Sequence, residues 1–201
     1  MPQPDHISAL GTPDPATLDA DLQAIWAKCM EKLGFVPGVY SAYSLKPQRL
    51  RNFMAMFGEV MFAESALSKL EREMIAVVVS SANRCYYCLV AHGAEVRRLS
   101  GDPELGEMMA LNYRVAPLVA RQRAMLDYAW KLTATPWLID ETDREALRAQ
   151  SFENGDIFDI SETVGFYNLS NRMAAATDMM PNREYHRSDR GAAYVPPKKK
   201  K

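Results

Sequence analysis

The chain has 201 residues, 48% of them hydrophobic and 24% charged, which suits one sizeable hydrophobic core rather than two. Its formal net charge is −1, but four of the 24 basic residues form the run Lys198–Lys201, so the rest of the chain carries 20 basic against 25 acidic residues. An acidic body argues against nucleic acid as the main partner. No apolar run is long enough to cross a bilayer, and the first residues lack a signal-peptide pattern, so we expect no membrane association.

The cysteine content indicates a reducing compartment. Three cysteines are too few, and odd in number, for the disulfide scaffold of a secreted protein. We therefore expect a cytoplasmic protein, in which a close pair of cysteines is catalytic or metal-binding rather than structural.

Helical periodicity dominates the chain after an extended, proline-rich lead-in over residues 1–14. Strand signals are nearly absent, so the predicted fold class is all-α, with one domain over residues 15–187 and a flexible tail over 188–201. In chain order the predicted helices are one that ends at Gly34, a short one within GFVPGVY, one from Pro47, one over 68–82, one over 85–99, a short one over 104–111, one from Pro117 to 133, one from Asp140 or Thr142 to Gln150, and one over 155–177.

The helix over residues 68–82 is predicted to be central. The segment Ser68-Lys69-Leu70-Glu71 has the form of a capping box, with a hydroxyl at the N-cap and a carboxylate three residues later. The following sequence, MIAVVVSSA, is apolar almost all round, which is typical of a helix buried on every side.

The stretch CYYCLVAH places Cys85, Cys88 and His92 on one face of the next helix, since roughly 100° separates successive residues. Cys85 lies at the helix N-terminus, where unpaired N–H groups favour an anion. The helix dipole alone therefore marks Cys85 as the more acidic thiol. A nearby histidine and the C-x-x-C spacing both favour a lowered thiol pKa.

Glu73 completes this cluster if the two helices form an antiparallel pair. A reversal of the chain near Asn83 brings Glu73 beside His92. A glutamate within so apolar a helix needs a partner. A carboxylate that orients an imidazole, which in turn serves a thiol, follows the nucleophile–base–orienter arrangement.

The spacing Glu73-x11-Cys85-x2-Cys88-x3-His92 resembles the signature of the alkylhydroperoxidase D-like superfamily, which includes the carboxymuconolactone decarboxylases. The segments GFVPGVYSAYSLKPQRL, DISETVGFYNLSNRMA and MPNREYH resemble its peroxidase-related branch, and the likeness extends over most of residues 20–187. It implies an AhpD-like helical bundle built around the antiparallel pair that carries the motif, assembled as a homo-oligomer.

The resemblance also implies an oxidoreductase, a thiol-dependent peroxidase for small-molecule hydroperoxides that serves antioxidant defence without a bound cofactor or metal. It makes Cys88 the peroxidatic thiol and Cys85 the resolving one, with Glu73 and His92 managing protons. An external thiol or a lipoyl-type reductant would then reduce the redox-active disulfide. The chain departs from the best-known members at Tyr87, where they carry histidine, and a phenol is a poor proton shuttle at neutral pH.

Two alternatives remain open at this point. The first is a metal-binding protein in which Cys85, Cys88 and His92, with or without Glu73, hold zinc. The second is a lactone-decarboxylase-like enzyme without thiol redox chemistry, although the complete cysteine pair counts against it.

For three further features we favour interpretations without a catalytic role. Cys29 is expected to be an inert core or interface thiol, and His186 a solvated tail residue, with a tail folded over a neighbouring subunit near the site as the alternative. The last feature is a Phe/Met group, which we expect in the core or a subunit interface rather than around a peroxide pocket: Phe53, Met54, Met56, Phe57 and Met61.

Overall fold

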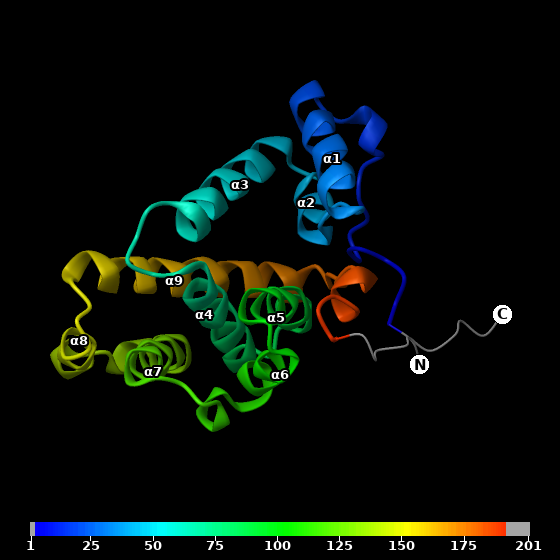
Figure 1. Cartoon of the computed structure of the whole chain (residues 1–201). Coiled ribbons are helices and arrows are strands. Elements are labelled where there is room, and N and C mark those ends of the chain that lie inside the picture. Colours follow the sequence, from blue (N-terminus) through cyan, green and yellow to red (C-terminus); the bar gives the residue numbers. More distant parts are fainter. Residues whose placement is uncertain (1–2, 192–201) are drawn as a thin grey trace.

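The computed structural model describes residues 3–191, and within that range the chain forms helices and no strand, which confirms the all-α prediction (Figure 1). Of the predicted flexible tail over residues 188–201, residues 192–201, which include the lysine run, lie outside the described residues. The α-helices are α1 (Ala20–Leu33), α2 (Gly38–Tyr43), α3 (Pro47–Phe62), α4 (Lys69–Ala82), α5 (Tyr86–Ser100), α6 (Pro103–Asn112), α7 (Ala120–Ala134), α8 (Glu141–Arg148) and α9 (Asn154–Ala176). Short 3-10 helices include η1 (Pro15–Thr17) and η4 (Arg183–His186).

Most helix ends lie where capping residues predict them. Ser68 accepts from the Glu71 N–H while the Glu71 carboxylate accepts from the Ser68 N–H, so the capping box of α4 is present. Gly34 ends α1 in the left-handed conformation, at φ 76°. The predicted start at Pro117 is wrong, because the Leu118 N–H bonds back to the Ala116 carbonyl and the next residue is extended. The helix α7 therefore begins three residues later, at Ala120.

Helix α4 lies at the centre of the molecule, as its apolar sequence predicts. Every residue from Glu71 to Ser80 is buried. This helix packs against α5, α6, α7 and α9, and the long helix α9 crosses above it in Figure 1. Because α4 contacts helices on several sides, side chains that project from it reach the interior between α5 and α9, where the candidate site lies.

The two ends of the described chain lie side by side, with the blue lead-in running past the red C-terminal segment in Figure 1. The Ala9 N–H donates to the Thr177 carbonyl at 2.9 Å, and His6 Nε2 lies 2.9 Å from an Asp178 carboxylate oxygen. The buried Arg97 of α5 donates to carbonyl oxygens of the C-terminal segment, 2.9 Å from that of Tyr185. Both end segments therefore pack against the helical body.

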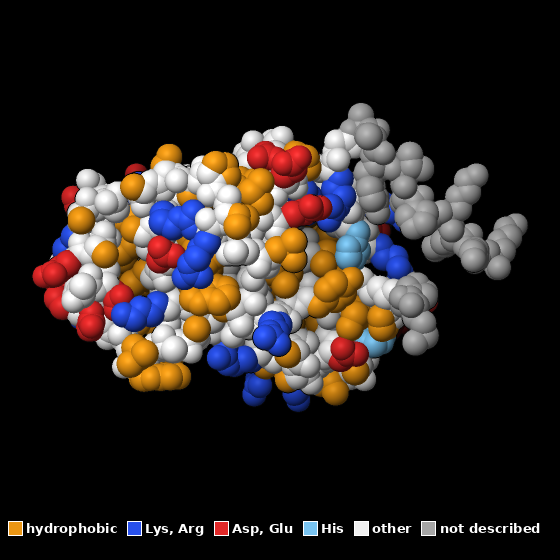
Figure 2. Space-filling model, turned by 90° about the horizontal axis from the view of Figure 1, so that it is seen from below, with side chains coloured by type: hydrophobic (Ala, Val, Ile, Leu, Met, Phe, Trp, Pro, Cys, Tyr) orange, Lys and Arg blue, Asp and Glu red, His pale blue; other side chains and the backbone are white. Residues whose placement is uncertain are grey.

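The surface carries mixed side chains. On the face seen in Figure 2, lysine and arginine side chains are scattered among hydrophobic ones. None of the helices in the described part of the chain combines the length and the apolar composition needed to span a membrane.

Candidate active site

The helical hairpin formed by α4 and α5 brings the predicted site residues together. The chain reverses over Asn83, the C-cap of α4, and Arg84, which is left-handed at φ 54° and precedes the Cys85 N-cap of α5. This reversal places Glu73 Oε2 2.7 Å from His92 Nδ1. The two side chains are largely shielded, with exposed fractions of 9% for Glu73 and 15% for His92. The predicted contact between the two helices is therefore present.

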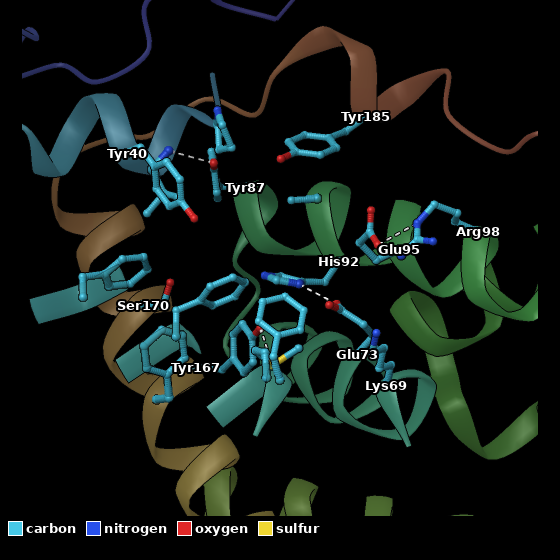
Figure 3. Close-up of a pocket in the computed structure, with 18 of the residues that line it drawn as sticks. Tyr40, Lys69, Glu73, Tyr87, His92, Glu95, Arg98, Tyr167, Ser170 and Tyr185 are labelled. Atoms are coloured by element: carbon cyan, nitrogen blue, oxygen red, sulfur yellow. Dashed lines mark hydrogen bonds and ion pairs between the residues drawn. The ribbon is translucent and has the colours of Figure 1, made fainter. Parts of the chain in front are cut away.

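The Glu73 contact sets the role that His92 can take. A carboxylate only accepts hydrogen bonds, so the imidazole carries a proton on Nδ1, and in its neutral form Nε2 is left as an acceptor. In Figure 3 the second ring nitrogen of His92 points away from Glu73, into the space between α5 and α9. The ring of Tyr167 packs edge-on against the imidazole, with centroids 4.7 Å apart. His92 is thus oriented as a proton acceptor facing that space.

Cys85 and Cys88 are free thiols in one buried cluster. The hydrogen bond from the Cys88 thiol is the main cause that lowers the pKa of Cys85 to about 7. Backbone N–H groups at Cys88 and Tyr87 and the charge of His92 act in the same direction, against the effect of burial. The bond to Cys85, together with burial, raises the pKa of Cys88 well above that of an ordinary thiol. Cys85 is therefore the more acidic thiol of the reduced pair, and Cys88 is the one that keeps its proton.

Two polar side chains of α9 also contact Cys88. Ser170 Oγ lies 3.9 Å from Cys88 Sγ, and Asn171 also hydrogen-bonds to this sulfur. Both contacts lower the pKa of Cys88, but the bond to Cys85 and burial raise it more. Asn171 is itself held by Asn83 and Ser80, at 2.9 Å and 3.0 Å. Sequence spacing could not reveal these partners, because they lie about eighty residues from the motif.

A cavity of about 270 Å³ adjoins the cysteine cluster. His92, Glu73 and Ser170 contribute polar groups to its wall (Figure 3), whereas neither Cys85 nor Cys88 is among the residues that line it. Charged side chains also line it, among them Lys69 and the ion pair of Glu95 with Arg98. Most of the remaining wall is apolar, including Val39, Phe53, Phe57, Met61, Phe62 and Leu99.

Three members of the Phe/Met group line this cavity, a position that the predicted core role did not include. Phe53 and Met61 are core residues as predicted, yet they also form part of the cavity wall with Phe57. Met56 is exposed. A stripe of apolar residues cannot by itself show that its helix faces a hollow, because the gap depends on how the neighbouring helices are spaced.

Tyr87 has a structural role in place of the histidine found in the best-known family members. Its hydroxyl accepts a hydrogen bond of 2.8 Å from the Val39 N–H, which ties α5 to α2 (Figure 3). Burial raises the pKa of this phenol well above its usual value, so it keeps its proton. Tyr87 is thus an anchor, and proton transfer at this site depends on other groups.

Cys29 and His186 lie outside the cluster. Cys29 is partly buried, and burial raises the pKa of its thiol. His186 is not a solvated tail residue, because its Nε2 lies 2.9 Å from Gln3 Oε1 and 3.3 Å from the Tyr86 hydroxyl. The C-terminal segment therefore folds over its own chain beside the cysteine pair.

The zinc alternative finds no support in this arrangement. Among residues 3–191, no three His, Cys, Asp or Glu side chains are grouped so that they could hold a metal ion. Glu73 is engaged by His92 Nδ1, and the two free thiols hydrogen-bond to each other, so these groups already have partners within the protein.

Comparisons with known proteins agree with this description. Residues 47–129 match the model of the carboxymuconolactone decarboxylase family. An uncharacterized peroxidase-related protein from Silicibacter sp. TM1040 has 55% sequence identity and a TM-score of 0.90, with 94% of this chain and 100% of that chain covered. A second such protein from Ralstonia eutropha JMP134, described as an alkylhydroperoxidase AhpD core, has 39% identity and a TM-score of 0.90, with 94% and 99% covered.

The debrominase Bmp8, solved with 2,3,4-tribromopyrrole, shares the fold at 19% identity and a TM-score of 0.74, with 88% of this chain and 93% of that chain covered. No curated protein sequence matches the chain significantly. The fold, the family model and the two close relatives together show that this chain belongs to the carboxymuconolactone decarboxylase family, with an AhpD-like helical bundle.

Proposed function

We propose that this protein is a thiol-dependent peroxidase that reduces organic hydroperoxides through Cys85 and Cys88. The observation that carries the proposal is the thiol pair, with the pKa of Cys85 lowered and that of Cys88 raised, beside a cavity into which the carboxylate-oriented His92 faces. With a pKa of about 7, roughly half of Cys85 is thiolate at neutral pH, against about 3% for an ordinary thiol. The names of the two close relatives, both peroxidase-related, point to the same chemistry.

The proposed reaction begins with the proton of the Cys88 thiol. This proton moves to Cys85, and the Cys88 thiolate attacks the terminal oxygen of the hydroperoxide. An S–O bond forms, the O–O bond breaks, and the sulfur loses two electrons to the peroxide. The departing alkoxide recovers the proton through His92 and leaves as the alcohol, which returns Cys85 to the thiolate form.

Resolution then uses the acidity of Cys85. Its thiolate attacks the Cys88 sulfenic acid, an S–S bond forms, and the released hydroxide is protonated to water. An external thiol or a lipoyl-type dithiol returns the two electrons. This order of roles gives the low pKa of Cys85 a use, because the resolving sulfur must be a nucleophile when the sulfenic acid appears.

The cavity favours an organic substrate over hydrogen peroxide. Hydrogen peroxide has no apolar group that could contact the aromatic and aliphatic wall, whereas an aromatic or alkyl hydroperoxide would remove that wall from water. We further propose that the protein acts in the cytoplasm as a homo-oligomer.

The decisive test is mass spectrometry of the reduced protein before and after one equivalent of cumene hydroperoxide. We expect a loss of about two mass units confined to the peptide that contains residues 85–88, as for disulfide formation. Cys88→Ser should abolish peroxide consumption, whereas Cys85→Ser should still oxidise Cys88 once, more slowly because the sulfur that takes up the Cys88 proton is gone, and should stop at sulfenic acid. The reverse pattern would assign the attack to Cys85, and a pair that stays reduced in excess peroxide would sink the proposal.

A second test addresses the alternatives. Metal analysis of protein purified without chelators should give less than stoichiometric zinc, and turnover of a lactone acid by a permanently reduced protein would favour the decarboxylase interpretation instead.

A further inference from the structure

The Tyr43 hydroxyl is a buried polar group for which the proposed reaction supplies the missing partner. Among the residues that the structure describes, it is the only buried side-chain nitrogen or oxygen without a hydrogen-bond partner. An unsatisfied buried polar group costs about 1–3 kcal/mol, so native proteins rarely keep one without a reason.

The ring of Tyr43 is held firmly where it lies. It stacks on Phe53, with centroids 4.4 Å apart and planes inclined by 30°. The same ring packs against the buried cluster that contains Cys85 and Cys88. Phe53 also lines the cavity, so Tyr43 contacts both a residue of the cavity wall and the cluster that holds the cysteine pair.

The remaining donors around Cys88 are already engaged in the reduced protein. Ser170 lies 3.9 Å from Cys88 Sγ, and Asn171 bonds both to that sulfur and to Ser80. Oxygen transfer to Cys88 would add an acceptor that the reduced site does not contain. A sulfenate oxygen is strongly polar, and in so buried a cluster it would need a donor.

We propose that the Tyr43 hydroxyl donates a hydrogen bond to the oxygen that Cys88 receives from the hydroperoxide. This inference rests on the proposed function. The S–O bond forms as the O–O bond breaks, negative charge develops on the oxygens, and a preplaced O–H donor stabilises that charge without reorganisation.

Tyr43 also keeps the proton that this role needs. Burial, and then the nearby charge of Cys88, raise the pKa of the Tyr43 phenol above its ordinary value. The hydroxyl therefore remains a donor at every pH at which the thiol pair reacts. It neither gives up nor gains a proton in the cycle.

The test compares Tyr43→Phe with its parent in a Cys85→Ser background, which stops the reaction at the Cys88 sulfenic acid. One equivalent of cumene hydroperoxide is added, and the sulfenic acid is trapped with dimedone and counted by mass spectrometry. We expect Tyr43→Phe to slow sulfenic acid formation by about tenfold or more, as loss of one transition-state donor does elsewhere. The melting temperature of the reduced protein should not fall, because the lost hydroxyl has no partner to leave behind.

Tyr128→Phe is the matched control. Its hydroxyl lies 3.1 Å from Ser161 Oγ, between α7 and α9 and outside the cavity. This variant should lower the melting temperature and leave the rate unchanged, the opposite of what we expect for Tyr43→Phe.

Each other outcome overturns the inference in a recognisable way. An unchanged rate in Tyr43→Phe shows that the hydroxyl does not meet the transferred oxygen, and it leaves the peroxidase proposal standing. A large drop in the melting temperature shows that the hydroxyl is already bonded in the reduced state. If the Cys85→Ser parent forms no sulfenic acid at all, the proposed function fails together with this inference.

Discussion

Replacing Cys88 with alanine should raise the pKa of Cys85, because the Cys88 thiol is the main donor to the Cys85 thiolate. The two backbone N–H donors and His92 stay in place, so we expect part of the two-unit depression to survive. A rise of about one unit, to a pKa near 8, corresponds to about 1.4 kcal/mol less stabilisation of the thiolate. The thiolate fraction at pH 7 then falls from about 50% to about 9%.

The choice of assay follows from these magnitudes. Alkylation rates would change only about twofold at pH 7, because a thiolate of higher pKa is also the better nucleophile, with a Brønsted slope of about 0.4–0.5. Titration of the thiolate absorbance near 240 nm between pH 5 and 10 reads the midpoint directly. Cys29→Ala serves as the control, since burial raises the pKa of that thiol and its removal should leave the midpoint near 7. A midpoint in Cys88→Ala that stays within about 0.3 units of the parent would refute the assignment of Cys88 as the main donor to Cys85.

The same pair makes the stability of the reduced protein depend on pH. The folded pKa of Cys85 is below its reference value of 9.0, so its contribution is present above pH 9 and is lost as the pH falls through 7. A two-unit shift is worth about 2.7 kcal/mol at most. Above pH 9 the raised pKa of Cys88 lowers the stability, because the unfolded chain loses its second thiol proton there while the folded chain keeps it. Urea unfolding of the reduced protein should therefore show a stability maximum near pH 9 that Cys85→Ser lacks.

Three further substitutions test the framework around the thiols. Glu73→Gln removes the carboxylate charge that holds His92 in place, so cumene hydroperoxide consumption should fall about tenfold or more while the melting temperature changes little. An unchanged rate would count against the proposed proton transfer by His92. Tyr87→Phe leaves the Val39 N–H without its acceptor and should cost about 1–3 kcal/mol in urea unfolding, whereas a neutral result would mean that Tyr87 is not an anchor. Gly106→Ala places a Cβ 2.9 Å from a backbone carbonyl oxygen of α5, so it should destabilise by about 1–3 kcal/mol, and wild-type stability would show that α6 can shift freely.

The part of the site that a sequence can reveal is local. The capping box at Ser68 and Glu71 fixes where α4 begins, and helical periodicity fixes which faces of α4 and α5 carry Glu73 and His92. Once the chain is known to reverse after residue 82, their contact follows from counting. The direction of the Cys85 pKa shift also agrees with its N-terminal position, although the neighbouring Cys88 thiol is its main cause.

The rest of the site depends on contacts between distant segments. Ser170 and Asn171 approach Cys88 only because α9 crosses the hairpin, and no spacing rule relates them to the motif. Tyr43 reaches the cysteine cluster from α2. The position of His186 was misjudged for the same reason, because its partner Gln3 lies at the opposite end of the sequence.

The covering of the cysteine cluster by the C-terminal segment has a consequence for biosynthesis. Met179 and Tyr185 pack on the cluster that holds both thiols, and Arg97 fastens this segment through backbone carbonyls. Ribosomes release a chain from its N-terminus onward, so Cys85 and Cys88 emerge about ninety residues before the segment that shields them. During that interval the nascent hairpin presents an uncovered dithiol to cellular oxidants. Premature disulfide formation in unfinished chains is thus a specific hazard of this architecture, and the reducing cytoplasm we propose is the setting that would contain it.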